Sequence, residues 1–296
     1  MSEWKEVAIG DIAILKNGKK RPNVSGSIPV YGGNGIMDYV DSYNDENCIA
    51  IGRVGAYCGC VYLTKGKVWI SDNAISAKAN KNVNNVFLYY LLGSLNLNRH
   101  RIGGAQPLMT QDLINRIRIS LPPIKEQQKI ASILSSLDSK IENNRKISAN
   151  LEAQAQALFK HWFIEFAPFK DGKFVESELG MIPEGWRVGT LTEIADYMNG
   201  LAMQKFPPLS EEDAIPVLKI KELGQSQCDS NSDKCSKHIK PEYIIKDGDV
   251  IFSWSGTLIV DIWCGGICGL NQHLFKVTSK EYPKWFYLFW TKYHLA

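Results

Sequence analysis

Clusters of charged side chains are the first candidates for catalytic chemistry in this 296-residue chain. The densest cluster combines Glu242, Asp247 and Asp249 with Lys246, residue types that a metal-dependent nuclease could use. These residues stand in the segment PEYIIKDGDVIF, which reads more simply as a charged turn between two apolar strands. We therefore predict no catalytic residue, with the nuclease kept as the weaker interpretation.

Motifs for cofactors and metals are also missing from the sequence. No Gly-x4-Gly-Lys-Ser/Thr segment occurs, which argues against a P-loop, and no Asn-Pro-Pro-Tyr motif occurs. The seven cysteines form no paired Cys-x2-Cys framework, so we expect reduced thiols and no metal ligands; a zinc site at Cys228, Cys235 and His238 is the alternative. Without a run of 18 apolar residues or an export leader, we expect no membrane span and a cytoplasmic location.

Basic and amide side chains instead suggest binding to a polyanion. Residues 1–120 carry 14 Lys and Arg against 9 Asp and Glu, a surplus of five, while residues 181–296 carry 12 against 14. Lys and Arg contact phosphates, whereas Arg, Asn and Gln read base edges, although solvated loop residues have the same composition. The DNA-contact candidates are Lys19, Lys20, Arg21, Asn34, Arg53, Tyr57, Asn73, Arg99, His100, Arg101 and Gln106.

An internal repeat predicts the framework that positions these side chains. WKEVAIGDIAILKNG, which starts at Trp4, matches WRVGTLTEIADYMNG, which starts at Trp186, at five positions with one offset. Further blocks follow in the same order: IPVYGGNG with IPVLKIKEL, CIAIGRVGAYCGCVY with DVIFSWSGTLIVDIW, and FLYYLL with WFYLFW. Chance similarity among strand–turn–strand patterns is the alternative. We predict two copies of one mixed α/β module, and the second copy offers Lys205, Trp254, Ser255, Asn271, Gln272 and His273 for DNA contact.

A long segment between the two copies predicts a single helix. Residues Ile124 to Ala167 include neither Gly nor Pro, and Pro122-Pro123 and Pro168 delimit them. Apolar positions advance by alternating steps of four and three, which is typical of a coiled-coil seam; an amphipathic helix wrapped on its own domain is the alternative. The seam positions are Ile130, Leu134, Leu137, Ile141, Asn144, Ser148, Leu151, Ala155, Leu158 and Trp162.

The same residues carry a family resemblance. The segments LPPIKEQQKIASILSSLDSKIENNRK, LEAQAQALFKHWFIEF and GMIPEGW resemble the central conserved region of type I restriction-modification specificity subunits. The W…IA…NG openings and GGAQP of residues 103–107 resemble the target-recognition domains of that family. The resemblance covers essentially the whole chain, and the combination of LPP, EQQ and ALFKHWF is its most specific part.

The resemblance implies a non-catalytic subunit that binds a bipartite double-stranded DNA target and docks methyltransferase subunits through the long helix. Restriction subunits would join through the complex, and S-adenosylmethionine, ATP and Mg would be bound only by partner subunits. We therefore expect an α+β fold with a first target-recognition domain at residues 1–122, a spacer helix at residues 123–168 and a second recognition domain at residues 169–296.

The family pattern also raises a question about the second recognition domain. The chain stops at Ala296, shortly after the WFYLFW block. The resemblance implies that a full-length member would continue through the rest of the second recognition domain and a second spacer helix, so we expect the second domain to be C-terminally incomplete and to lack that helix. Two alternatives to a complete DNA reader therefore stand: a truncated assembly partner that reads no DNA, and a homodimer that pairs the spacer helices of two copies.

Overall fold

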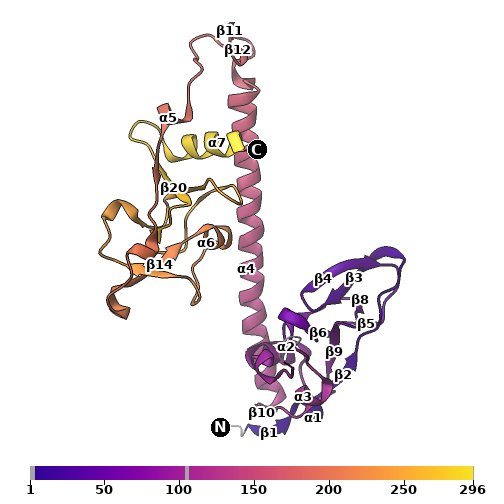
Figure 1. Ribbon diagram of the computed structural model, residues 1–296. Helices are drawn as coiled ribbons and strands as arrows, with labels where there is room; N and C mark the ends of the chain where they lie inside the picture. The colour runs from indigo at the N-terminus through magenta and orange to yellow at the C-terminus, as the bar shows by residue number, and fades with distance from the viewer. Residues whose placement is uncertain (1–3, 104–106, 296) are drawn as a thin grey trace. The chain divides into compact units, whose positions relative to one another are not determined.

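The computed structural model describes residues 4–103 and 107–295, which divide into two units, Met1–Ser148 and Ala149–Ala296. Each unit combines small β-sheets with helices, and a long helix lies between the two modules in the chain (Figure 1). The predicted α+β class with a long central helix is therefore confirmed. No helix in the described ranges is both long enough and apolar enough to cross a lipid bilayer.

The first unit is built on two four-stranded sheets. One sheet has the order β2-β9-β6-β7 and is antiparallel throughout, and the other has the order β4-β3-β8-β5 with β3 and β8 parallel. The elements are β1 (Lys5–Ala8), α1 (Ile9–Ile12), β2 (Ala13–Asn17), β3 (Ser25–Gly32), β4 (Gly35–Val40), β5 (Asp45–Glu46), β6 (Ile49–Gly52), β7 (Val61–Leu63), β8 (Lys67–Ile70), β9 (Ala74–Ala79), α2 (Asn85–Ser94), α3 (Gln111–Asn115), β10 (Arg118–Leu121) and the first part of α4 (Ile124–Phe159).

Helix α2 closes the core of this unit and joins it to α4. Leu88 and Leu92 of α2 are fully buried against β-strand residues such as Ile49 and Ile75. The side chain of Asn84 caps α2 by accepting a hydrogen bond from the Phe87 nitrogen, which satisfies one of the free amides of the first turn.

The buried side chain of Gln127 fixes the start of α4. Its Oε1 accepts a 3.0 Å hydrogen bond from the backbone nitrogen of Asn84, and its Nε2 donates a 2.8 Å hydrogen bond to the backbone oxygen of Pro122. Because a buried amide needs partners for both ends, these bonds hold the N-terminus of α2 against the start of α4.

The second unit repeats the topology of the first. Its sheets have the orders β13-β20-β17-β18 and β15-β14-β19-β16, with β14 and β19 parallel as β3 and β8 are. The elements after α4 are β11 (Phe174–Ser177), β12 (Gly180–Pro183), α5 (Leu191–Ile194), β13 (Asp196–Asn199), β14 (Ala214–Leu218), α6 (Ile220–Gln225), β15 (Lys234–Ser236), β16 (Ile244–Ile245), β17 (Val250–Ser253), β18 (Ile259–Ile262), β19 (Cys268–Leu270), β20 (Leu274–Thr278) and α7 (Lys284–Leu295).

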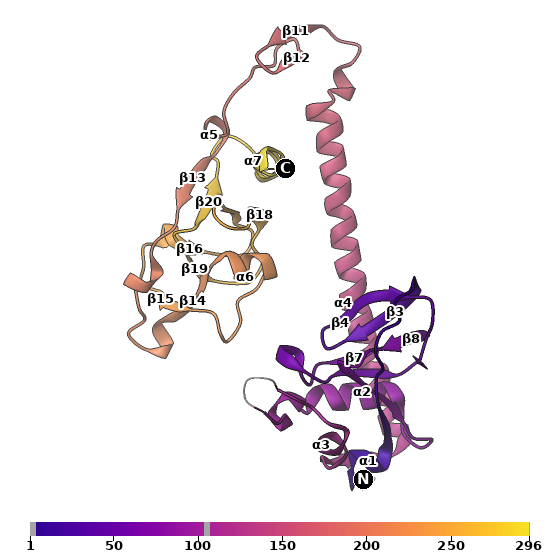
Figure 2. The ribbon, with the colours of Figure 1, turned by 45° about the vertical axis from the view of Figure 1, so that its right-hand side comes forward.

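Helix α7 occupies the place in the second module that α2 has in the first. Tyr287 and Leu288 pack on Val250, Val260 and Val277 of the sheet β13-β20-β17-β18, and Figure 2 shows α7 beside this sheet. The predicted second copy of the module is thus present as a folded unit, and the aromatic block WFYLFW is helical.

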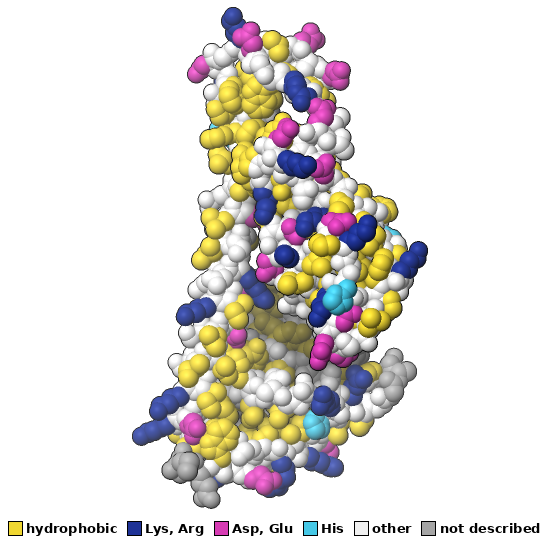
Figure 3. Space-filling model, turned by 90° about the vertical axis from the view of Figure 1, so that its left-hand side faces the viewer, with side chains coloured by type: hydrophobic (Ala, Val, Ile, Leu, Met, Phe, Trp, Pro, Cys, Tyr) yellow, Lys and Arg dark blue, Asp and Glu magenta, His cyan; other side chains and the backbone are white. Residues whose placement is uncertain are grey.

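Aromatic rings pack the last turns of α4 against α7 within the second unit. Phe159 is buried and packs on Phe289 and Trp290 of α7, with ring centroids 5.4 and 5.2 Å apart. Phe163 contacts Trp186 and Trp285 in the same way. Figure 3 shows apolar side chains gathered next to the charged tip of this unit.

The α-helix ends earlier than the predicted limit at Pro168. A π-helical turn at Lys160–Ile164 follows α4, and Phe166 then adopts a left-handed conformation with φ of 53°. A 3-10 turn at Ala167–Phe169 follows, and Pro168 stands near its start, where a proline needs no backbone N–H.

Candidate nucleic-acid interface

Two predicted contact residues meet at the end of β6 in the first unit. Arg53 follows β6 directly, and Asn73 lies in the turn that leads into β9. The backbone nitrogen of Arg53 donates a 2.9 Å hydrogen bond to the backbone oxygen of Asn73, and the backbone nitrogen of Asn73 donates to Oγ of Ser71. Neighbouring strands thus bring together two residues that lie 20 positions apart in the sequence. We name this pair the first corner.

The end of β2 packs closely beneath the first corner. The Gly18 nitrogen donates to the Ala74 oxygen at 3.0 Å. A Cβ atom on Gly18 would lie only 1.9 Å from the Ser71 oxygen, so only glycine fits. Lys19 forms a parallel bridge with Ser71, which places the start of the predicted Lys19–Arg21 cluster beside the corner.

The tip of the β3–β4 hairpin is also close to the first corner. A Cβ atom on Gly33 would lie 3.6 Å from the Val54 oxygen and 3.8 Å from the Asn73 oxygen and from Cβ of Tyr57. Asn34, exposed at this tip, accepts a 3.4 Å bond through Oδ1 from the Tyr62 hydroxyl. The predicted residues Asn34, Arg53, Tyr57 and Asn73 therefore share one edge of the unit.

The remaining basic candidates lie around this edge in different environments. Lys20 is exposed, whereas Arg21 forms an ion pair with Asp38 of β4, which offsets part of its charge. Arg99, His100 and Arg101 are exposed in the loop after α2, and the backbone of this loop pairs with Val54 through Leu108. The candidate Gln106 lies outside the described residues.

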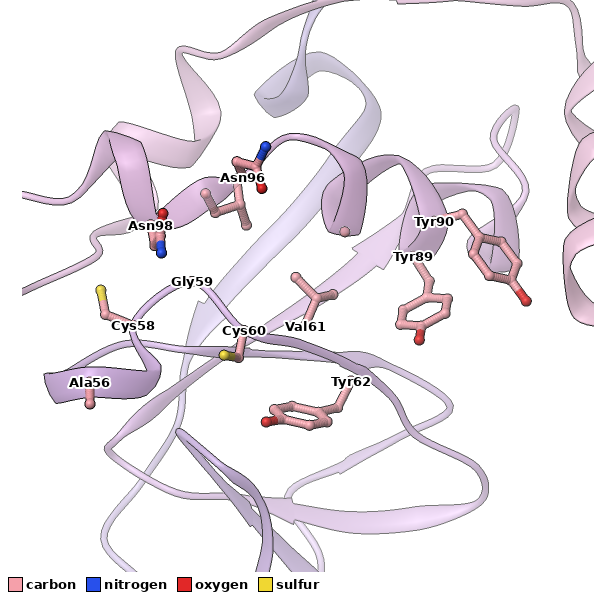
Figure 4. A pocket seen from close by; sticks show the side chains of 12 residues that line it. Ala56, Cys58, Gly59, Cys60, Val61, Tyr62, Tyr89, Tyr90, Asn96 and Asn98 are labelled. Atoms are coloured by element: carbon pink, nitrogen blue, oxygen red, sulfur yellow. The ribbon is translucent and has the colours of Figure 1, made fainter. Parts of the chain in front are cut away.

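A pocket of about 490 Å³ adjoins this edge (Figure 4). Tyr62 of β7 and Tyr89 and Tyr90 of α2 contribute its aromatic rings, and the amides of Asn96 and Asn98 reach it from the following loop. Burial raises the pKa of the Tyr89 hydroxyl, and the Asp138 carboxylate raises it further. The lining is therefore aromatic and neutral at physiological pH.

The second unit forms a corresponding corner with different side chains. Trp254 follows β17 as Arg53 follows β6, and His273 precedes β20 as Asn73 precedes β9. Gly200 donates to the Leu274 oxygen at 2.9 Å, and a Cβ atom on it would lie 2.2 Å from the Asn271 oxygen. The two modules therefore share this backbone arrangement and differ in the exposed side chains that it carries. We name the pair Trp254 and His273 the second corner.

The other second-module candidates have separate positions. Asn271 is buried, and its Oδ1 accepts a 3.2 Å hydrogen bond from the backbone nitrogen of His273. This side chain therefore shapes the turn and does not face solvent. Ser255 and Gln272 contact the His273 ring at 3.3 and 3.4 Å. Lys205 is exposed in a short 3-10 turn, Met203–Lys205.

Helix α4 exposes an apolar stripe along much of its length. Leu137, Ile141, Leu151, Leu158 and Trp162 of the predicted seam are each about half exposed, and Asn144 and Ser148 are exposed between them. Ile130 and Leu134 are half-buried, and Ile133, which the predicted seam left out, is exposed. The stripe is available for a partner wherever α4 does not contact its own modules.

The sequence predicts reduced thiols and no metal ligand. Across residues 4–103 and 107–295, no three His, Cys, Asp or Glu side chains gather in a way that could hold a metal ion. Burial raises the pKa of the Cys235 thiol to about 11 and also raises the pKa of Cys268, which keeps both protonated at neutral pH.

Several residues that join the elements were missed at the sequence level. Gln127 and Tyr90 connect α2 to α4, and Phe159 connects α7 to α4. The EQQ motif carries part of the resemblance, but nothing in the local pattern shows that one glutamine is buried.

Comparisons with known proteins agree with this duplicated architecture. Residues 1–153 and 183–295 match the model of the type I restriction modification DNA specificity domain. The type I restriction enzyme MjaIX specificity subunit of Methanocaldococcus jannaschii is 34% identical over 57% of this chain and 41% of its own length. The MjaVIII specificity subunit of the same organism is 27% identical over 87% of this chain and 65% of its own length. The chain thus spans less than two thirds of either curated relative.

A solved structure shows the same fold. The S subunit of a type I restriction-modification system from M. genitalium superposes with a TM-score of 0.57 at 15% identity. The superposition covers 97% of this chain and 76% of that one.

Proposed function

The chain belongs to the type I restriction modification DNA specificity domain family, and from this premise we propose that it is the DNA-recognition subunit of a type I restriction-modification complex. In this proposal each module binds one half of an interrupted double-stranded DNA sequence. The chain itself catalyses no reaction and acts in the cytoplasm by positioning its partners.

The repeated corner is the observation that supports this proposal most directly. Both modules build it from the same tight glycine approach, at Gly18 and Gly200, which fixes the backbone at the strand ends. The exposed residues differ, with Arg53 and Asn73 in one module and Trp254 and His273 in the other. A constant scaffold with variable side chains suits two half-sites of different sequence.

The proposed partners follow from the surface of α4. Its exposed apolar stripe would dock the methyltransferase subunits, and restriction subunits would join through that complex. A second copy of this chain could pair through the same stripe and form a homodimer. S-adenosylmethionine, ATP and Mg would be bound by the partner subunits, so this chain would need no cofactor of its own.

Reconstitution with the methyltransferase subunit of the same system tests the proposal. The complex is incubated with a random DNA library and S-adenosylmethionine, and methylated positions are identified by sequencing. We expect one bipartite motif, and no motif with the methyltransferase subunit alone as control. Methylation without sequence preference in the complex would contradict DNA recognition and would favour an assembly partner that reads no DNA.

A further inference from the structure

The guanidinium of Arg53 stands apart from other cations of the first module. Arg53 is half-buried, and its Nε atom is buried with no hydrogen-bond partner among residues 4–103 and 107–295. By contrast, Arg21 pairs with Asp38 and Lys78 pairs with Asp45. Within the described part of the chain, no carboxylate forms an ion pair with Arg53, although Asp72 is exposed in the adjacent turn.

A partly desolvated cation without a partner is energetically unfavourable, because burial removes water and no acceptor replaces it. The backbone nevertheless holds Arg53 firmly. The backbone nitrogen of Arg53 donates a hydrogen bond to the backbone oxygen of Asn73 at 2.9 Å. Its backbone oxygen accepts one from the backbone nitrogen of Met109 at 2.8 Å. The backbone of Arg53 is thus held in place while Nε stays an unused donor, as expected of a residue whose acceptors come from a ligand.

The form of the donors identifies the class of ligand. A guanidinium presents a planar fork of N–H groups, which matches the O6 and N7 acceptors of guanine in the major groove. Phosphate contacts are better supplied by long exposed side chains such as Lys19 and Lys20, which can follow the DNA backbone. Asn73 adds an exposed amide beside Arg53, and an amide reads base edges in the same groove.

We propose that Arg53 is the specificity-determining residue of the first module and reads a guanine in its half-site. This inference rests on the proposed function and adds to it the base and the residue.

The second corner carries no equivalent fork. The Trp254 indole donates to Oδ1 of Asn199 at 3.4 Å, and the two ring nitrogens of His273 face Ser255 and Gln272. These polar atoms already have partners within the protein, so the second corner presents mainly aromatic surface. The guanine dependence assigned to Arg53 is therefore confined to one half-site.

Variants in the reconstituted complex test the assignment. Arg53→Ala is expected to lower discrimination at one G·C pair of one half-site by about 10- to 100-fold, while the other half-site keeps its sequence. Arg53→Lys keeps the charge but not the fork, so it should retain non-specific affinity and still lose discrimination. Arg118→Gln is the matched control, because Arg118 is exposed and pairs with Glu6 in the first unit. If Arg53→Ala weakens binding equally on all DNA sequences, or leaves the motif unchanged, the assignment is overturned.

Modified DNA tests the same contact with the unaltered protein, so a folding defect in a variant cannot obscure the result. Each guanine of the motif is replaced in turn by 7-deazaguanine, which lacks the N7 acceptor. We expect about tenfold weaker binding at one guanine of a single half-site, and Arg53→Ala should be insensitive to that replacement. If no guanine shows an effect, the inference fails while the proposed function stands. If the unmodified complex has no motif, the proposed function itself fails.

Discussion

The phenolic oxygen of Tyr90 donates a 2.7 Å hydrogen bond to Oδ2 of Asp138 and so joins α2 to α4 within the first unit. Burial and the adjacent carboxylate raise the pKa of Tyr90 well above its usual value. Together with the Gln127 amide, this bond attaches the recognition module to the helix that follows it.

Replacement of Tyr90 by Phe should destabilise the first unit by about 1 kcal/mol, because the Asp138 carboxylate loses a donor that water replaces only in part. Chemical denaturation gives the free energy of unfolding. Tyr39→Phe is the control, since Tyr39 is half exposed and its hydroxyl has no bond among the described residues. Equal stability of the two variants would show that the bond to Asp138 contributes nothing.

The tight glycines of the two corners should respond alike to substitution. Gly18→Ala and Gly200→Ala each place a Cβ atom about 2 Å from a backbone oxygen, so we expect at least about 2 kcal/mol of destabilisation in either module. Gly93→Ala is the matched control, because a Cβ atom there meets nothing within 4 Å and Gly93 lies in α2. Alanine favours helix over glycine, so this variant should gain up to about 1 kcal/mol. Thermal unfolding of the three variants tests this contrast. Equal shifts in melting temperature for all three would refute it.

Asp45 should make the first unit sensitive to acid. Burial alone would raise the pKa of its carboxyl, but hydrogen bonds from Lys78, Ser76 and the Glu46 nitrogen outweigh this and lower it. A lowered pKa in the folded state gives stability that is present above about pH 4, the unfolded value, and is lost as the pH falls through the folded value. The advantage of the wild type over Asp45→Asn in free energy of unfolding should therefore shrink between about pH 5 and pH 2. A difference that stays constant over this range would exclude the assigned role.

The exposed stripe of α4 predicts self-association when no methyltransferase subunit is present. Light scattering at micromolar concentrations should detect oligomers of the wild type, and Leu137→Glu with Leu151→Glu should abolish them without loss of folding, because both leucines are half exposed. Ala153→Glu adds one negative charge on another face of the helix and should leave the oligomer intact. A monomeric wild type at high micromolar concentration would refute this prediction.

Local signals in the sequence were sufficient to predict the helices and strands but not the contacts between them. The Pro122-Pro123 pair and the glycine-free run correctly predicted the start of α4, since these features act within a few residues. The helix end was less predictable, because the π-helical turn at Lys160–Ile164 coincides with packing of Phe163 on Trp186 and Trp285. The candidate DNA residues were chosen by type alone, and their gathering at one edge depends on strand pairing.

By itself, the sequence determined that the chain contains two related mixed modules and a long helix between them, because periodicity, glycine turns and repeated segments are encoded locally. It also identified Arg53 and Asn73 as candidates but not as neighbours. Only the tertiary structure decided that they share a corner, that Asn271 is buried and that Nε of Arg53 has no hydrogen-bond partner among the described residues. Those properties arise from the burial and hydrogen bonding of residues far apart in the chain, which no local pattern specifies.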